Sequence, residues 1–111
     1  AEPIAPAVWR AFAVKTRAAG LDPAAAQPVY GLAEATLAVT FPPPGEVAVP
    51  LVLDRASLSD GVALDAEPGA GAVELMDVGF PVAGCSVRVV DDAGAVLGDR
   101  RVGHIMVSGP Q

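Results

Sequence analysis

The segment 29–36, with the sequence VYGLAEAT, places an aromatic ring, a glycine and a carboxylate within five positions. Tyr30 offers a flat surface for a nucleobase, Gly31 allows a close approach to the backbone, and Glu34 offers oxygen ligands to a hard cation beside phosphates. A β-branched residue and an aromatic ring before a glycine predict a short strand that stops at a tight turn. Because ligands in open α/β folds collect where strands end, this segment is the first candidate for a site.

Each residue that could do chemistry also has a purely structural interpretation. A tyrosine before a glycine is more often a packed turn residue, and Glu34 taken alone is a solvated acid near a helix start. Cys85 fits a buried small side chain, and His104 fits a surface or strand-edge position because no nucleophile or acid stands at a diagnostic spacing. The sequence therefore predicts no catalytic residue in this chain.

Composition and charge exclude several classes of protein. The chain has 111 residues, a net charge of −6 and one cysteine. The acidity leaves no basic face for a nucleic acid or an anionic membrane, and a single cysteine excludes an internal disulfide. The N-terminus lacks the pattern of a signal peptide, and the longest apolar run is far shorter than the ~20 residues of a membrane helix. The sequence predicts a soluble, cytoplasmic protein with no nucleic-acid partner and no membrane insertion.

Eleven prolines and twelve glycines predict many short elements joined by turns. A helix is expected at 6–19, where Pro6 suits a first turn and Gly20 a helix end. A helical turn or loop at 54–61 would be capped by Asp54 and ended by Gly61. Strands are expected at 27–30, 37–41, 47–53, 62–65, 73–78, 86–90 and 102–107, with a hairpin turn at 91–94. The chain thus changes from α/β in its first part to antiparallel β in its second, with a division expected between 1–45 and 46–111.

Four stretches, taken in order, resemble the adenylate-forming superfamily of acyl and aryl ligases, and within it the fatty-acyl-AMP ligases. They are AEPI at 1–4, YGLAEATL at 30–37, GFPVAG at 79–84 and VGHIMVSG at 102–109. The second stretch nearly repeats the signature of fatty-acyl-AMP ligases, whereas many acyl-CoA synthetases have threonine in place of Ala33. The family usually has arginine where Phe80 stands and glutamate where His104 stands.

The resemblance implies a fold of mixed α/β class. Both ends of the sequence look like cuts through a longer protein, so an internal fragment of the large N-terminal part is expected. Residues 1–45 would supply a helix and a strand of the adenine-binding sheet, and residues 46–111 most of a distorted antiparallel β-barrel. The chain contains no phosphate loop ending in lysine and no mobile C-terminal domain with a catalytic lysine. The fragment alone is therefore expected to be inactive.

The resemblance also implies roles for individual residues. It places the adenine pocket at Ala1, Glu2 and Pro3, and it makes Tyr30 the ring that packs on adenine. Gly31, Leu32 and Ala33 would approach the α-phosphate. Glu34 would be the magnesium ligand. The parent protein would use ATP and Mg²⁺ to convert a fatty acid into acyl-AMP and pyrophosphate. It would then pass the acyl group to the thiol of an acyl carrier protein or a polyketide synthase carrier domain.

Two alternatives remain open at this point. The parent could be an acyl-CoA synthetase of the same superfamily, with coenzyme A as the acceptor. It could also be a non-catalytic, β-rich binding module in which the motif is degenerate, an interpretation that Phe80 and His104 favour.

Overall fold

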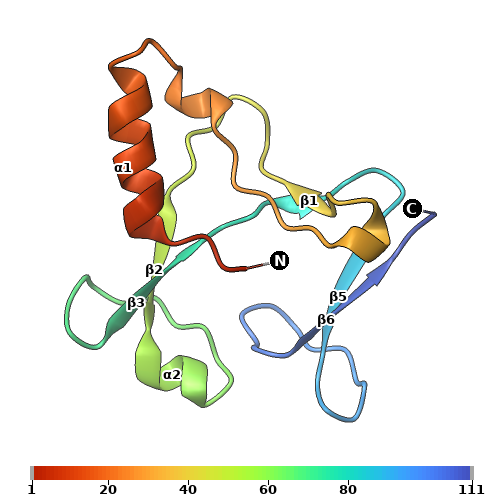
Figure 1. Ribbon diagram of the computed structural model, residues 1–111. Helices are drawn as coiled ribbons and strands as arrows, with labels where there is room; N and C mark the ends of the chain where they lie inside the picture. The colour runs from red at the N-terminus through yellow and green to blue at the C-terminus, as the bar shows by residue number, and fades with distance from the viewer. Residues whose placement is uncertain (1, 111) are drawn as a thin grey trace.

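The computed structural model describes residues 2–110. They contain two helices, two short 3₁₀ turns and six strands. In chain order they are α1 (Pro6–Arg17), η1 (Pro23–Ala25), η2 (Ala33–Ala35), β1 (Thr40–Phe41), β2 (Pro50–Asp54), α2 (Arg55–Ser59), β3 (Ala72–Met76), β4 (Phe80–Pro81), β5 (Ser86–Val90) and β6 (His104–Ser108). Figure 1 shows α1 at the side of the molecule remote from the β5–β6 ribbon.

The six strands pair as three separate antiparallel ribbons. β1 pairs with β4, β2 with β3, and β5 with β6, and each sheet contains two strands. The predicted antiparallel character of the second half is thus confirmed. The predicted distorted barrel is not supported, because no sheet within residues 2–110 closes on itself.

Both helices form where local signals predict them. Pro6 lies in the first turn of α1, the helix ends at Arg17, and Gly20 follows with a φ of 85°. The carboxylate of Asp54 accepts a 2.7 Å hydrogen bond from the amide of Ser57, which caps α2, and Gly61 ends the turn with a φ of 79°. No helix in the described part of the chain is long and apolar enough to cross a membrane.

The strands around the opening motif are shorter than predicted. The predicted strand 27–30 is extended chain in which only Tyr30 forms an isolated bridge, to Thr40. The predicted strand 37–41 shrinks to Thr40–Phe41, because Thr36 and Leu37 adopt φ values of 51° and 88° and turn the chain away from the extended path. The predicted strand 62–65 likewise forms only isolated bridges. The helix expected in residues 1–45 is therefore present, and of the strands expected there only Thr40–Phe41 forms.

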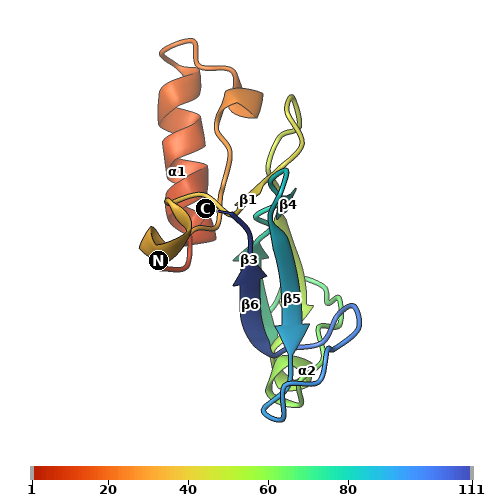
Figure 2. The ribbon, with the colours of Figure 1, turned by 90° about the vertical axis from the view of Figure 1, so that its right-hand side faces the viewer.

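The molecule is a thin slab with a small core. Its extents are 48 × 40 × 20 Å, and the turned view in Figure 2 has a narrower outline than the view in Figure 1. Among the described residues the buried apolar side chains are Pro28, Ala35, Val39 and Leu53. Three of these four lie within the YGLAEATL motif or two residues from its ends, so the best-packed part of the slab holds this motif in place.

Candidate functional site

The motif folds into a loop that closes on its own backbone. The carbonyl oxygen of Tyr30 accepts hydrogen bonds from the amides of Val39 at 2.9 Å and Thr40 at 3.1 Å. Inside this closure the amide of Leu37 donates to the carbonyl of Leu32 at 3.1 Å. We call residues 30–40 the motif loop. Its ends are fixed together, so the residues within it keep a defined spacing.

Thr40 fastens the motif loop to the second half of the chain. Its hydroxyl donates to the carbonyl of Val78 at 2.6 Å and accepts a 3.4 Å hydrogen bond from the amide of Tyr30. Thr40 is buried, and the amide of Val82 donates to the neighbouring carbonyl of Val39 at 2.9 Å. These contacts place the segment after β3 directly beside Tyr30.

A pocket of about 620 Å³ opens beside this junction. It is lined by three separate segments, whose residues are Glu2, Pro3, Ile4, Val29, Tyr30, Gly31, Leu37, Leu75, Met76 and Val78. We call it the first pocket. Its volume falls within the range of about 300–1,000 Å³ that small-molecule sites occupy. Four of the residues expected to bind the nucleotide, Glu2, Pro3, Tyr30 and Gly31, thus come together, while Ala1 lies outside the described residues.

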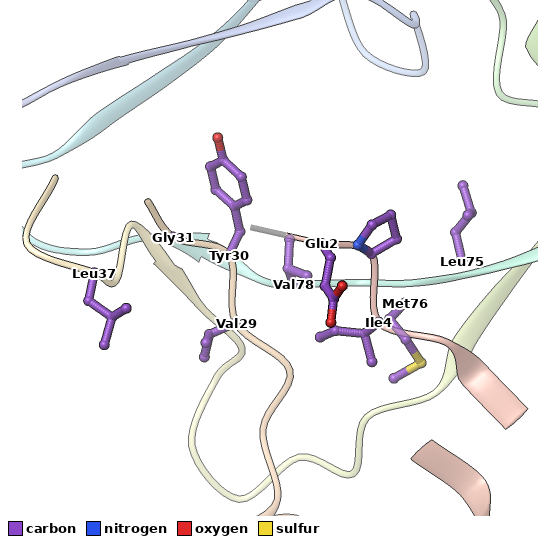
Figure 3. Close-up of a pocket in the computed structure, with 10 residues that line it drawn as sticks. Glu2, Ile4, Val29, Tyr30, Gly31, Leu37, Leu75, Met76 and Val78 are labelled. Atoms are coloured by element: carbon purple, nitrogen blue, oxygen red, sulfur yellow. The ribbon is translucent and has the colours of Figure 1, made fainter. Parts of the chain in front are cut away.

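The side chains that line the first pocket are apolar apart from Glu2 and the hydroxyl of Tyr30. Figure 3 shows that the ring of Tyr30 points to one side of its backbone, whereas Val29 and Leu37 point to the other. The ring therefore presents its own surface instead of packing on these two aliphatic side chains. Such a ring beside apolar walls is suited to stacking on a flat heteroaromatic group.

Glu34 lines a second pocket, which has a volume of about 330 Å³. This second pocket is lined by Leu32, Glu34, Ala35, Cys85, Val107, Ser108 and Gly109. Of the remaining predicted residues, Leu32 and Glu34 thus share this pocket, and Ala33 lines neither pocket. The motif loop therefore separates its aromatic residue and its carboxylate into two neighbouring hollows.

Glu34 has an exposed side chain that is free to meet a cation. Within residues 2–110 no group of three or more histidine, cysteine, aspartate and glutamate side chains is placed to hold a metal ion. A magnesium ion needs only one or two carboxylates when phosphate oxygens and waters complete its shell. Glu34 is thus compatible with a cation that arrives with a phosphate ligand.

An ion pair connects α1 to the wall of the first pocket. The guanidinium of Arg10 donates hydrogen bonds to both carboxylate oxygens of Glu74, at 3.1 and 2.8 Å. These hydrogen bonds, together with the charge of Arg10, lower the pKa of Glu74, and Glu74 raises the pKa of Arg10. Because Glu74 directly precedes Leu75 and Met76, the pair holds the pocket wall against the helix that follows Glu2–Ile4.

Sequence reasoning missed several residues that line the two pockets. The first pocket is lined by Leu75 and Met76 of β3 and by Val78 just after it. The second pocket is lined by Cys85, just before β5, and by Ser108 at the end of β6. Their residue types are ordinary for strands, so only the arrangement of the ribbons places them at a site. Their residue types do not mark them as pocket residues, although Ser108 belongs to the VGHIMVSG stretch at 102–109.

The AMP-binding enzyme family matches residues 1–111, and the chain belongs to this family. Family membership agrees with the resemblance carried by the YGLAEATL motif. It also agrees with the mixed helix and antiparallel ribbons of the fold.

Curated relatives cover nearly the whole chain. A long-chain-fatty-acid–AMP ligase of Mycolicibacterium smegmatis is 34% identical over 110 residues, and a protein of the same name from Mycobacterium marinum is 36% identical over 112 residues; each match covers 97% of this chain. A 4-hydroxyphenylalkanoate adenylyltransferase of Mycobacterium tuberculosis is 37% identical over 91 residues, or 82% of this chain. These matches span only 18%, 18% and 14% of the respective relatives.

Solved structures show the same fold. A structure described under fatty acyl-adenylate ligases from E. coli and L. pneumophila superposes with a TM-score of 0.89 at 31% identity, over 99% of this chain and 20% of that one. An L. pneumophila fatty acyl-adenylate ligase in complex with acyl adenylate and pyrophosphate gives a TM-score of 0.86 at 31% identity, over 98% of this chain and 19% of that one. The chain thus corresponds to about a fifth of these ligases.

Proposed function

We propose that the full-length protein containing this chain is a fatty-acyl-AMP ligase, which uses ATP to convert a fatty acid into acyl-AMP and pyrophosphate. The observation that carries the proposal is the first pocket. It brings Glu2 and Pro3 beside Tyr30 and Gly31, although these pairs lie far apart in sequence. A flat base can stack on the Tyr30 ring while apolar walls exclude water.

The proposed nucleotide site runs from the first pocket along the motif loop to the second. Glu2 and Pro3 border the base, Tyr30 stacks on it, and the backbone of Gly31, Leu32 and Ala33 follows the sugar–phosphate part. Ala33 has no side-chain polar group, so it would contribute only its backbone. Glu34 would hold Mg²⁺ against the phosphates, where the cation offsets the negative charge that otherwise repels the attacking carboxylate.

The proposed reaction is a substitution at the α-phosphorus. A carboxylate oxygen of the fatty acid forms a bond to this phosphorus, the bond to the β,γ-pyrophosphate breaks, and pyrophosphate leaves with the electron pair. The chain described here positions the nucleotide for this step. The groups that move protons or hold the acyl chain belong to other parts of the proposed enzyme.

We also propose an acyl acceptor and an acyl substrate for the full-length enzyme. We propose that the acyl group passes to the thiol of a carrier protein or a polyketide synthase carrier domain, with coenzyme A as the alternative acceptor. A long-chain fatty acid is supported by the names of two relatives, and a hydroxyphenylalkanoic acid is a second candidate because a third relative is named for it.

The proposal is tested on the full-length protein by exchange of labelled pyrophosphate into ATP, with and without acid substrate. We expect exchange that requires magnesium and is stimulated by long-chain fatty acids more than by hydroxyphenylalkanoic acids. Adding carrier protein or coenzyme A to the acyl-adenylate then identifies the acceptor. Absence of exchange with both classes of acid would overturn the proposal and favour the non-catalytic β-rich module.

Two further proposals concern the setting of the site. We propose that residues 1–45 and 46–111 belong to two different subdomains of the full-length enzyme. We also propose a cytoplasmic location, which the single cysteine supports.

A further inference from the structure

The space beside Gly31 is filled by the motif loop itself. A Cβ added at Gly31 would overlap the carbonyl oxygen of Leu37 and would lie only 3.1 Å from the Cα of Ala38. These are backbone atoms, which cannot rotate away as a flexible side chain can. At Gly71 a Cβ would meet nothing within 4 Å. The missing side chain of Gly31 therefore makes room for the returning chain, and not for a ligand on that side.

The end of the motif loop returns to Gly31 through an unfavourable backbone conformation at Thr36 and Leu37. Thr36 and Leu37 adopt φ values of 51° and 88°, which residues other than glycine rarely adopt. Hydrogen bonds from the amide of Thr36 to Ala33 at 3.3 Å and from the amide of Leu37 to Leu32 at 3.1 Å hold this conformation. The contact between Gly31 and the Leu37 carbonyl thus depends on a strained turn that the surrounding loop maintains.

Both residues of this contact belong to the first pocket, and Leu32, which follows Gly31, belongs to the second. Tyr30, Gly31 and Leu37 line the first pocket, whereas Leu32 and Glu34 line the second. A change in the Leu37 carbonyl would therefore alter the spacing between the aromatic ring and the carboxylate without removing either group.

We propose that Gly31 and Leu37 are positioning residues, whose backbone contact sets the separation between Tyr30 and Glu34. This inference rests on the proposed function, in which Tyr30 holds the base and Glu34 the metal–phosphate end of the same nucleotide. A misplacement of about 1 Å can lower a rate by about a hundredfold, so a fixed separation has a large effect on the reaction.

Four substitutions in the full-length protein separate the backbone contact from other effects. Gly31→Ala forces the Leu37 carbonyl to move. Leu37→Gly accepts a φ of 88° without strain, so the protein folds while the loop loses its constraint. Leu37→Ala removes most of the same side chain but keeps the restricted backbone, and Gly71→Ala is the control for adding a methyl group to a glycine.

Two measurements are made on each variant. The dissociation constant of adenosine without magnesium reports on the first pocket alone, and the kcat and the magnesium dependence of acyl-adenylate formation report on both ends together. We expect kcat to fall by up to about a hundredfold in Gly31→Ala and Leu37→Gly, a larger factor than any rise in the dissociation constant of adenosine, and we expect both variants to require more magnesium. Leu37→Ala should lose much less kcat than Leu37→Gly, and Gly71→Ala should match the wild type.

The inference is overturned if Gly31→Ala and Leu37→Gly behave like Gly71→Ala, or if Leu37→Gly loses adenosine binding and kcat in the same proportion. Glu34→Ala, measured alongside, separates this failure from that of the proposed function. A large loss in Glu34→Ala without a loss in Leu37→Gly leaves the proposed function standing and removes only the positioning role. Acyl-adenylate formation that is absent in the wild type itself removes the proposed function.

Discussion

The Nε2 atom of His104 lies 2.8 Å from the Oδ1 atom of Asp92, and this contact joins the first residue of β6 to the turn after β5. The neighbouring Asp91 already accepts hydrogen bonds from the amides of Ala93 and Ala95, at 2.9 and 2.8 Å. A glutamate at position 104, which is usual in the family that the sequence resembles, would place a second carboxylate beside Asp92. The histidine is thus suited to this turn, and it lines neither pocket.

We therefore expect substitutions of His104 to affect the hairpin and not the reaction. His104→Gln in the full-length protein should keep acyl-adenylate formation within about twofold, because exposed changes away from a site usually have small effects. His104→Glu should lower the melting temperature through like-charge repulsion, and adding Asp92→Asn should restore it. A large loss of activity in His104→Gln would instead place this residue in the enzyme's function.

The Arg10–Glu74 pair is expected to support ATP binding from outside the pocket. Arg10→Ala should raise the KM for ATP because α1, and with it the Glu2–Ile4 segment, is no longer held against the Leu75 wall. The reversed pair, Arg10→Glu with Glu74→Arg, should recover part of the loss. Arg17→Ala, at the other end of α1, is the matched control. If the KM for ATP is equal in Arg10→Ala and Arg17→Ala, the pair has no such role.

The same pair predicts a dependence of stability on pH. Hydrogen bonding from Arg10, with its charge, lowers the pKa of Glu74 in the folded protein. The pair's stabilisation is then fully present above the ordinary pKa of glutamate and disappears as the pH falls through the lowered pKa of Glu74. Melting curves of wild type and Glu74→Gln should differ at neutral pH and converge in acid. A difference that persists unchanged in acid would show that the pair's charge state does not matter.

Tyr30 is expected to act through its ring and not through its hydroxyl. The ring of Tyr30 points away from Val29 and Leu37 in Figure 3, so its faces are not covered by these two side chains. Tyr30→Phe should keep the KM for ATP, whereas Tyr30→Ala should raise it by about tenfold or more, the usual loss when one stacked base loses its aromatic partner. An equal loss in both variants would assign the role to the hydroxyl.

Glu34 is expected to matter only when magnesium is involved. Glu34→Ala should lower acyl-adenylate formation by about a hundredfold, because a metal ion contributes several kcal/mol of charge stabilisation, and the variant should need more magnesium. Adenosine binding without the metal should be unchanged. Glu67→Ala, which removes an exposed carboxylate outside both pockets, is the control. Unchanged pyrophosphate exchange in Glu34→Ala would remove the metal role.

The sequence predicts those parts of the fold that depend on neighbouring residues. Pro6 and Gly20 mark the ends of the helical region, and Asp54 and Gly61 mark α2, because caps and glycine stops act within one turn. Strand 86–90 is predicted with its observed bounds, since its β-branched residues are followed at once by a turn. These features need no information from distant residues.

The errors arise where distant contacts decide. The strand predicted at 37–41 is shortened because the motif loop returns to Tyr30 and forces Leu37 into a positive φ, which no propensity of leucine indicates. The barrel was implied by the family resemblance, but the pairing of the strands determines whether a sheet closes. The residue types of the candidate site were visible in the motif. Its division into two pockets depends on β3, β5 and β6 and was not visible.

The thin slab shape has a consequence for local motion. The least extent is 20 Å and few side chains are buried, so little packing shields the backbone hydrogen bonds from solvent. Such bonds break through small, independent openings and not only when the whole chain unfolds. Amide hydrogens of the chain should therefore exchange with deuterium in separate groups. The β2–β3 and β5–β6 ladders would be among the slowest, and the amides of the motif loop would report directly on how firmly it is closed.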